Sequence, residues 1–345
     1  MQDVYNLKLE LNWEVISKLS KIDRFDASWS AIEKKEGQSL KQLKSIATVR
    51  SVGASTRIEG SKLNDEEVDK LLRDFSLDKL EDRDSQEVTG YFEVLNEISD
   101  AYEEIRITEN EIKGLHNLLL KYSQKDEWHK GDYKQHSNSV EATAADGSTK
   151  VVFQTTPPGY ETEDAMRKLV EWYDADQEIH PIIKSAIFSY EFVTIHPFQD
   201  GNGRMSRLLS NLLLLKNGYE WIQYVSFEHE IESRKSEYYR QLRQCQAQRP
   251  NEDVSKWVNF FMDTLINIQD QLMKKLERSG IESNLNPREK SILILISNHA
   301  GIKSGSISEK LNMPNPTTKK ILRRLFEANL IEKHGTGRGT NYTIK

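Results

Sequence analysis

Apolar residues recur every three to four positions along most of the chain, which is the spacing of an amphipathic α-helix. No self-similar period of about 20 to 50 residues accompanies this pattern, so a stacked repeat architecture is not expected. The pattern predicts a mainly α-helical chain with helices over residues 40–60, 64–75, 85–105, 108–122, 162–176, 180–198, 204–218, 236–248 and 253–280.

Two helix boundaries near the N-terminus carry clear signals. Gly60 ends the stretch "LKQLKSIATVRSVGASTRIEG", and glycine favours the left-handed conformation that closes a helix. Asn64 precedes the next apolar run with Glu67 three residues later, which is the spacing of a capping box. A short turn between two helices is therefore predicted after Gly60.

One insertion breaks the helical pattern, over residues 133–160. It contains a "DG" pair at 146–147, the β-rich stretch "TKVVFQTT" and then two prolines. A turn pair followed by β-branched residues is typical of a β-hairpin, and the prolines stop the second strand.

The last sixty residues have a different pattern. Helices are predicted over residues 286–301, 304–313 and 315–330, followed by two strands around a glycine-rich turn in 331–345. This order resembles a winged helix-turn-helix domain. Its candidate DNA contacts are Thr317, Lys319, Lys320, Arg323 and Arg324 on the third helix and Arg338 at the wing tip. The alternative is a protein-binding module with a solvated basic face.

Charge supports a division of the chain into two parts. The net charge is −6, and residues 287–345 hold eleven Lys and Arg against four acids, which is +7 and leaves −13 for the rest. The single cysteine, Cys245, cannot form an internal disulfide, and the N-terminus lacks a signal-peptide pattern. A cytoplasmic protein without a membrane span is therefore expected.

The stretch "TIHPFQDGNGRMSRLL" concentrates chemically useful groups at one turn before a helix. Its glycines leave backbone N–H groups uncovered at a helix N-terminus, where the helix dipole also favours an anion. Arg204 and Arg207 lie three residues apart and can reach the same anion. Asp200 would repel a bare polyphosphate, so its presence indicates Mg²⁺ between carboxylate and phosphates. His196 has the pKa range of a general base.

The segment "HPFQDGNGRMSR" matches every fixed position of the Fic family signature, so the chain resembles a Fic protein. The resemblance implies a Fic-type helical bundle with a β-hairpin flap and transfer of AMP from ATP to a Ser, Thr or Tyr hydroxyl of a protein. It assigns His196 as the base, Asp200 as the Mg²⁺ ligand and Phe198 as a core anchor of the loop. Phosphate contacts are then expected from Gly201, Asn202, Gly203, Arg204 and Arg207.

The resemblance also gives the hairpin and a later helix possible roles. A flap in Fic proteins pairs with an extended target segment, so nucleotide or target contacts are expected from Val152, Phe153, Gln154 and Thr155. Tyr238 and Tyr239 fall on the helix that resembles the wall of the adenine pocket. For each of these residues ordinary packing remains the alternative.

The stretch "STRIEG", from Ser55 to Gly60, resembles the inhibitory signature of Fic proteins that carry an autoinhibitory helix. Ser55 and Glu59 are one helical turn apart, and the Glu59 carboxylate is expected to form a bidentate pair with Arg207. That pair would occupy the guanidinium needed by the γ-phosphate. The alternative is an exposed glutamate before a glycine cap.

These predictions divide the chain into an N-terminal helical region, residues 1–100, with the inhibitory helix at about 40–60, a Fic domain over 101–275 and a winged helix over 286–345. An autoinhibited adenylyltransferase that acts on other proteins or itself is expected, together with a homodimer. The alternatives are a DNA-binding regulator that uses its Fic domain as a nucleotide sensor, an enzyme that removes AMP, or one that uses another nucleotidyl donor. The remaining histidines are expected at the surface or at helix caps: His116, His129, His136, His180, His229, His299 and His334.

Overall fold

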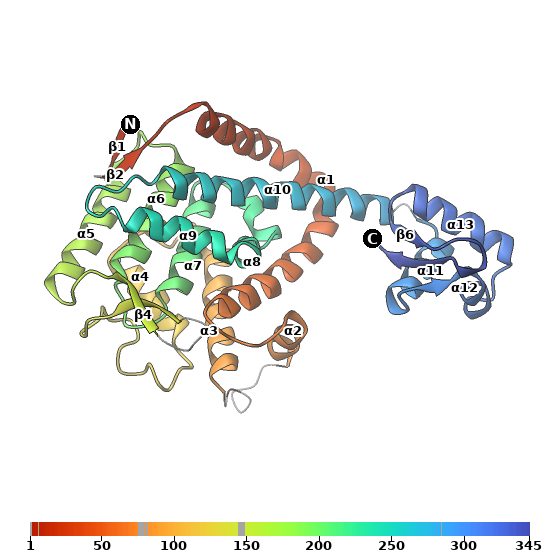
Figure 1. Cartoon of the computed structure of the whole chain (residues 1–345), viewed down its shortest axis with the longest axis horizontal. Helices are drawn as coiled ribbons and strands as arrows, with labels where there is room; N and C mark the ends of the chain where they lie inside the picture. The colour runs from red at the N-terminus through yellow and green to blue at the C-terminus, as the bar shows by residue number, and fades with distance from the viewer. Residues whose placement is uncertain (1, 6, 75–79, 81, 144–148, 284) are drawn as a thin grey trace. The chain divides into compact units, whose positions relative to one another are not determined.

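The computed structural model describes residues 2–5, 7–74, 80, 82–143, 149–283 and 285–345 (Figure 1). The chain divides into two compact units, Met1–Gln271 and Leu272–Lys345. The long helix α10, Ser255–Ser283, begins in the first unit and ends in the second. No helix among the described residues is long and apolar enough to cross a membrane.

The first unit is mainly helical, as predicted. Its helices before the hairpin are α1 (Trp13–Ile58), α2 (Asp65–Arg73), α3 (Arg83–Ala101) and α4 (Glu109–Leu119). After the hairpin come α5 (Tyr160–Ala175), α6 (Pro181–Ile195), α7 (Asn202–Lys216), the 3₁₀ helix η2 (Glu220–Tyr224), α8 (Phe227–Ser233) and α9 (Lys235–Gln246).

Helices α6 and α7 form the centre of this unit (Figure 1). Every residue of α6 from Ile182 to Ile195 is buried, and α7 is buried over most of its length up to Leu215. A helix that is apolar on all sides is stable only when other helices surround it. Accordingly α6 packs on α5 and α7, while α3 packs on α1, α4 and α7. The loop between α6 and α7 is therefore held by two fixed helix ends.

Helix α1 is much longer than the predicted 40–60 segment. It begins at Trp13, where Asn12 caps the first turn by accepting from the Val15 N–H at 3.1 Å. Glu36 has non-helical dihedral angles (φ −107°, ψ 15°), next to Gly37. The kink there explains why the periodicity indicated only the second half of the helix. The capping box of Asn64 and Glu67 is confirmed at the start of α2.

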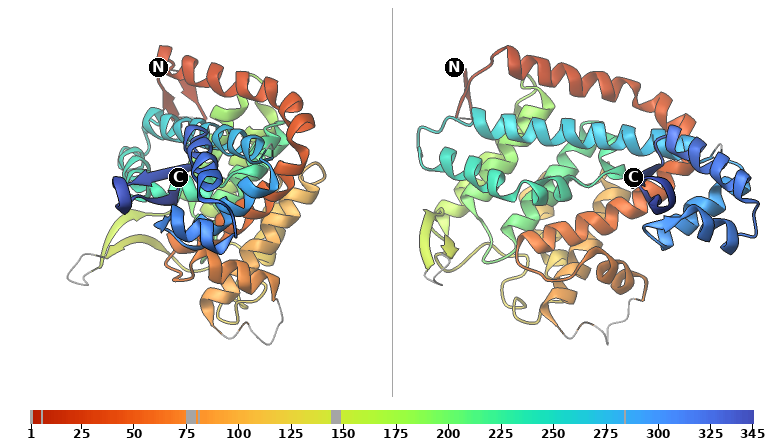
Figure 2. Two further views of the ribbon diagram at one scale, coloured as in Figure 1. Left: turned by 90° about the vertical axis from the view of Figure 1, so that its right-hand side faces the viewer. Right: turned by 45° about the vertical axis from the view of Figure 1, so that its right-hand side comes forward.

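The predicted hairpin is present as β3 (Ser139–Thr143) paired antiparallel with β4 (Thr149–Gln154). Figure 2 shows the two strands projecting from the helices of the first unit. The "DG" pair at 146–147 lies outside the described residues. A second small sheet pairs β1 (Gln2–Val4) with β2 (Leu7–Leu9).

The second unit has the winged-helix order predicted from the sequence. Its elements after α10 are α11 (Pro287–Asn298), β5 (Ile302–Lys303), α12 (Ser304–Lys310), α13 (Asn315–Glu327), β6 (Ile331–His334), the short 3₁₀ helix η3 (Gly337–Gly339) and β7 (Asn341–Ile344). Strand β7 lies between β5 and β6 and is antiparallel to both. The core of the second unit contains the buried residues Ile292, Ile296, Ile307, Leu322 and Leu325.

Candidate active site

Helix α6 ends at His196 because Pro197 cannot continue it. His196 takes left-handed dihedral angles (φ 56°, ψ 58°) and its Nδ1 lies 3.2 Å from the Val193 carbonyl oxygen. A carbonyl only accepts, so Nδ1 carries the proton and Nε2 keeps its lone pair. Burial and the nearby Lys134 charge lower the pKa of His196 to about 4, against the opposing effects of Val193, Glu59 and Asp200. His196 is therefore a neutral base at neutral pH.

The loop after His196 is held by its own side chains. Asn202 accepts from the Phe198 N–H at 2.9 Å and donates to the Phe198 carbonyl at 2.7 Å. The side-chain oxygen and one amino N–H of Asn202 are thus used within the loop. The second amino N–H is left for an acceptor, so the phosphate contact expected from Asn202 stays a prediction. No side chain caps the N-terminus of α7, where Gly201 has φ 80°. The first N–H groups of α7 remain suited to an anion.

His116 on α4 packs against the loop that follows His196. The prediction that His116 lies at the surface or at a helix cap is wrong. Its side chain is fully buried and stacks on Phe198 with ring centroids 3.7 Å apart. The Gly131 N–H donates to Nδ1 at 3.0 Å, so Nε2 carries the proton and donates to the Asp200 carbonyl oxygen at 3.0 Å. Burial lowers the pKa of His116 to about 4. The predicted burial of Phe198 is confirmed.

Asp200 lies among positive charges. Its Oδ1 accepts from the Gly201 N–H at 2.5 Å and from Arg204 Nη2 at 3.2 Å, and Arg83 Nη2 lies 3.9 Å from Oδ2. Burial opposes ionisation of Asp200, yet Arg204, the Gly201 N–H and Arg83 hold the pKa of its carboxyl below the ordinary value. A second carboxylate, Glu87, lies 3.5 Å from Arg204 Nη1. The carboxylate of Asp200 is ionised and available to a cation.

These residues fit Mg²⁺ only together with phosphates. The described residues contain no group of three acidic, histidine or cysteine side chains that could hold a metal alone. Mg²⁺ is often bound by one carboxylate plus substrate phosphates. Arg204 is 1% exposed, and its Nε has no hydrogen-bond partner in the described part of the chain. A buried donor without an acceptor beside Asp200 fits a bound anion.

Arg207 is buried and already engaged by the end of α1. Its Nε donates to Ser55 Oγ at 2.8 Å, and its Nη2 donates to the Ser55 carbonyl at 3.0 Å and to Glu59 Oε1 at 2.8 Å. The pair with Glu59 is therefore formed by one carboxylate oxygen, not by the two expected from the sequence, and Ser55 accepts from Nε and from Nη2. Against the effect of burial, the Glu59 charge raises the pKa of Arg207. Gly60 follows with φ 110°.

The Glu59 carboxylate also covers the start of α7. A Cβ atom added to Gly203 would collide with Glu59 Oε1 and lie 3.4 Å from Arg207 Nη1. The carboxylate therefore lies at an uncapped helix N-terminus beside a buried guanidinium, which is the environment that a phosphate group prefers. The Glu59 carboxylate thus lies where the chain could receive a phosphate group.

Three side chains, here called the clasp, hold the end of α1 in this place. Arg57 forms two bonds with Glu232 on α8, from Nε to Oε1 at 2.7 Å and from Nη2 to Oε2 at 3.0 Å. Lys235 on α9 donates to the Ile58 carbonyl at 2.6 Å. Asp65 adds a contact with Arg57 Nη1 at 2.9 Å. The clasp of Arg57, Glu232 and Lys235 fixes the backbone on both sides of Ile58.

The base of the hairpin is tied to the His196 loop through Lys134. This amine is buried and donates to Asn138 Oδ1 at 3.0 Å, Thr155 Oγ1 at 2.9 Å and the Ile195 carbonyl at 3.2 Å. Thr155 is itself buried, so its side chain belongs to the root of the hairpin. Phe153 is half-buried and Gln154 exposed, while the side chain of Val152 lies outside what the structure describes.

The two tyrosines of α9 differ. Tyr238 is buried against Trp257 and Phe260, with ring centroids 5.4 Å and 5.9 Å away, so it is a core residue. Tyr239 is half-buried and lies close enough to Glu59 for that charge to raise its pKa further, after burial. Of the two, Tyr239 has the exposure that a contact with a nucleotide requires.

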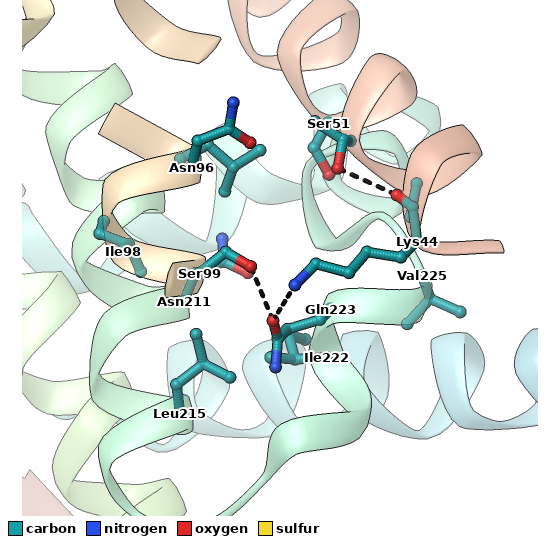
Figure 3. Close-up of a pocket in the computed structure, with 13 residues that line it drawn as sticks. Lys44, Ser51, Asn96, Ile98, Ser99, Asn211, Leu215, Ile222, Gln223 and Val225 are labelled. Atoms are coloured by element: carbon teal, nitrogen blue, oxygen red, sulfur yellow. Dashed lines mark hydrogen bonds between the residues drawn. The ribbon is translucent and has the colours of Figure 1, made fainter. Parts of the chain in front are cut away.

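A separate pocket lies beside the second half of α1 (Figure 3). Its volume of about 390 Å³, part of which is open to solvent, lies between α1, α3, α7 and η2. Gln223 Oε1 accepts from Lys44 Nζ at 2.9 Å and from Ser99 Oγ at 2.7 Å across it. Ser51 and Asn211 also line it, each four residues from Ser55 and Arg207 respectively. The helix that carries Glu59 therefore borders a pocket on this side.

The basic residues of α13 fall into two groups. Lys319, Lys320, Arg323 and Arg324 are all exposed. The two arginines form ion pairs, Arg323 with Glu327 on the same helix at 2.8 Å and Arg324 with the buried Glu289 on α11 at 2.9 Å. Thr317 is half-buried, and the Arg338 side chain lies outside what the structure describes. A nucleic-acid contact by α13 would thus depend mainly on the two lysines.

Several site residues were missed from the sequence: Arg83, Glu87, His116, Lys134 and Glu232. Only Arg83 and Glu87 had a local signal, the four-residue spacing of a helical ion pair, whose atoms lie 2.6 Å apart. The others reach the site from distant segments, and nothing beside them in the sequence indicates it.

Comparison with known proteins agrees with this site. Residues 106–214 match the Fic/DOC family and residues 285–334 match the MarR family. The chain thus carries a Fic domain followed by a winged-helix domain of the MarR family. The Fic domain contains both helices that frame the loop from His196 to Arg207.

The matches with individual relatives cover only part of those proteins. A protein adenylyltransferase Fic of Drosophila willistoni is 27% identical over 207 residues, 59% of this chain and 39% of that protein. A probable protein adenylyltransferase of Aquifex aeolicus is 44% identical over 62 residues, 18% of this chain and 19% of that protein. The chain therefore spans well under half the length of either relative that it matches.

Two solved structures have the same fold. A Fic family protein from Desulfovibrio desulfuricans aligns over 97% of both chains with a TM-score of 0.63 and 23% identity. A Fic domain containing signaling protein from Bacteroides thetaiotaomicron aligns over 74% of this chain and 97% of its own, with a TM-score of 0.59 and 26% identity. The Fic-type fold of the first unit is thereby confirmed.

Proposed function

We propose that the protein is an adenylyltransferase that moves AMP from ATP to a hydroxyl of a protein, another or itself, and that Glu59 holds it inactive. One observation carries the proposal: an internal carboxylate, Glu59, occupies the anion site made by Arg207 and the start of α7, next to a neutral histidine base. The names of the two sequence relatives support the same activity.

In the proposed reaction the target hydroxyl oxygen attacks the α-phosphorus of ATP. A new phosphorus–oxygen bond forms, the bond between the α- and β-phosphates breaks, and pyrophosphate leaves. The hydroxyl proton passes to Nε2 of His196, whose Nδ1–H is held by Val193. Such a base contributes about 10²- to 10⁴-fold.

The chain's other residues bind and orient the phosphates. The N–H groups at the start of α7, with Arg204 and Arg207, receive the polyphosphate, and Arg204 Nε gains the acceptor that it lacks in this structure. Asp200 would hold Mg²⁺, which neutralises phosphate charge when bound. The γ-phosphate needs Arg207, so Glu59 must withdraw first.

Labelling with α-labelled ATP and Mg²⁺ tests this function. Glu59→Gly is expected to raise incorporation of label about tenfold or more, because a charge-assisted hydrogen bond contributes about 1.5 to 3 kcal/mol. Glu59→Gln keeps the size of the side chain and should give a smaller rise. His196→Ala in the Glu59→Gly background should abolish transfer while a fluorescent ATP analogue still binds.

Three outcomes would replace the proposal. Label from another nucleotide but not from ATP would indicate a different nucleotidyl donor. Loss of AMP from a labelled protein, without net incorporation, would indicate the reverse reaction. Transfer that survives His196→Ala would refute the base.

A second function is proposed for the winged helix, on the observation that Lys319, Lys320 and Arg323 are exposed along α13. Such a helix suits the major groove of DNA, and the protein would then act as a regulator whose Fic domain senses nucleotide. A gel shift across salt concentrations tests it. Lys319→Gln should weaken DNA binding and reduce the slope of log affinity against log salt concentration by about one phosphate contact. A DNA affinity that does not change with salt would refute this second function.

Homodimerisation and a cytoplasmic location remain predictions.

A further inference from the structure

Lys134 is a buried amine with an unusual set of partners. An ammonium has three donors, and all three go to neutral acceptors: Asn138 Oδ1, Thr155 Oγ1 and the Ile195 carbonyl. In the described part of the chain no carboxylate forms an ion pair with it. A buried charge normally has an ionic partner, so its absence here requires a reason.

The three acceptors belong to two structures that must act together. Asn138 directly precedes β3 and Thr155 directly follows β4, so they are the two roots of the hairpin. Ile195 is the last residue of α6, and the Lys134 N–H also donates to the Pro197 carbonyl at 2.8 Å. One residue therefore joins both hairpin strands to the backbone on either side of His196.

Further hydrogen bonds connect the residues around Lys134. Asn138 Nδ2 donates to the Phe198 carbonyl at 2.9 Å, and Thr155 Oγ1 lies 2.6 Å from Asn138 Oδ1. Asn138 and Thr155 thus contact each other as well as the ammonium. A neutral amine has only two donors, so it could not keep all three bonds.

We propose that Lys134 is a positioning residue for the transfer reaction: its ammonium fixes the hairpin to the catalytic loop and places an unpaired positive charge beside His196. This inference rests on the proposed function, together with the pairing of the hairpin with a target segment that the sequence predicts. A carboxylate partner would fix the hairpin equally well but would cancel the charge. That charge opposes protonation of the base before a substrate arrives.

The charged groups that face His196 come from three segments of the chain. Lys134 disfavours the imidazolium, while Glu59 at the end of α1 and Asp200 in the loop favour it, and burial disfavours it most. Removing the Lys134 charge should therefore raise the pKa of His196 from about 4 toward its ordinary value of 6.5. Burial lowers the pKa of Lys134 itself to about 8, so the joint should weaken in alkaline solution.

The test compares Lys134→Met, which removes the charge and all three donors, with Lys134→Arg, which keeps the charge. Lys130→Met is the matched control, because Lys130 is a nearby lysine paired with Glu127 at 2.6 Å. Labelling is measured against pH in the Glu59→Gly background. The labelling rate falls on the acid side of its pH profile as His196 becomes protonated. In Lys134→Met this fall should move to higher pH, whereas in Lys134→Arg and Lys130→Met it should stay in place. Affinity for a fluorescent ATP analogue should stay within about twofold in all three, because Lys134 does not touch α7.

Two measurements need no activity and so separate this inference from the proposed function. Hydrogen exchange of the β4 amides should become faster in Lys134→Met only, and NMR titration should show the raised pKa of His196. Thermal unfolding checks that each variant is folded. If Lys134→Met lowers the rate equally at every pH and leaves both the exchange of β4 and the His196 titration unchanged, the lysine is only structural and the inference is wrong.

Discussion

The clasp predicts how firmly the end of α1, with the proposed inhibitory residue Glu59, is held. Glu232→Gln removes the negative charge that pairs with Arg57 but keeps the shape of the side chain. The Arg57 and Glu232 side chains are 21% and 23% exposed, and Asp65 still contacts Arg57 at 2.9 Å after the change. A partly exposed pair of this kind contributes about 1 kcal/mol, which corresponds to about a fivefold rise in the population with the end of α1 released.

The assay is the initial rate of self-labelling from α-labelled ATP. Glu232→Gln should raise it about fivefold in the otherwise unchanged protein. The matched control is Glu237→Gln, since Glu237 pairs with Arg234 at 3.0 Å without touching α1. The rate in the Glu59→Gly background should not change further, because the clasp then has no inhibitory carboxylate to hold in place. An equal rise in both backgrounds would refute the reasoning and show that Glu232 acts on the site by another route.

Two further predictions concern stability and packing. His116 is buried and neutral, and its pKa of about 4 lies below the ordinary 6.5, so the unfolded chain binds more protons between these values and stability falls as the pH drops from 6.5 to 4. The difference between the two pKa values corresponds to about 3 kcal/mol of folding free energy. The midpoint temperature of thermal unfolding should therefore fall less steeply with decreasing pH in His116→Gln than in the unchanged protein. Parallel plots of midpoint against pH for the two proteins would contradict this. Val225→Ile adds one methylene group to the pocket of Figure 3. It should raise the unfolding midpoint and lower background labelling about fourfold, from about 0.8 kcal/mol of added burial, and a rise in labelling would show that the pocket does not loosen α1.

The sequence indicated most of the catalytic loop because its chemistry lies within twelve consecutive residues, from His196 to Arg207. The bend at Pro197, the uncapped start of α7 and the two arginines follow from covalent order. Glu59 was also identified, since its one-turn spacing from Ser55 is local. What local order could not give is how the contacts of Arg207 are divided: Ser55 accepts twice and Glu59 accepts once.

Residues that act from a distance were not predictable in this way. Lys134 and His116 look like ordinary polar residues in their own segments, and only the folded chain places them beneath the loop. The first half of α1 was missed because Gly37 and the kink at Glu36 interrupt the apolar period. Burial and partner geometry, rather than residue type, distinguish Tyr238 in the core from Tyr239 at the edge of the site.

In the proposed function the space over Gly203 has to hold two anions in turn, the Glu59 carboxylate and the phosphate that replaces it. Any side chain there would collide with the Glu59 carboxylate, and it would also fill the space over the start of α7 where a phosphate is proposed to lie. A substitution at this position that expels the inhibitor would therefore exclude the substrate as well. Substitutions that activate the proposed enzyme without blocking its substrate must therefore change Glu59 or the side chains that hold Glu59 in place. Mutational screens for constitutive activity should accordingly find the N-terminal helix and its anchors, and should not find the glycine loop.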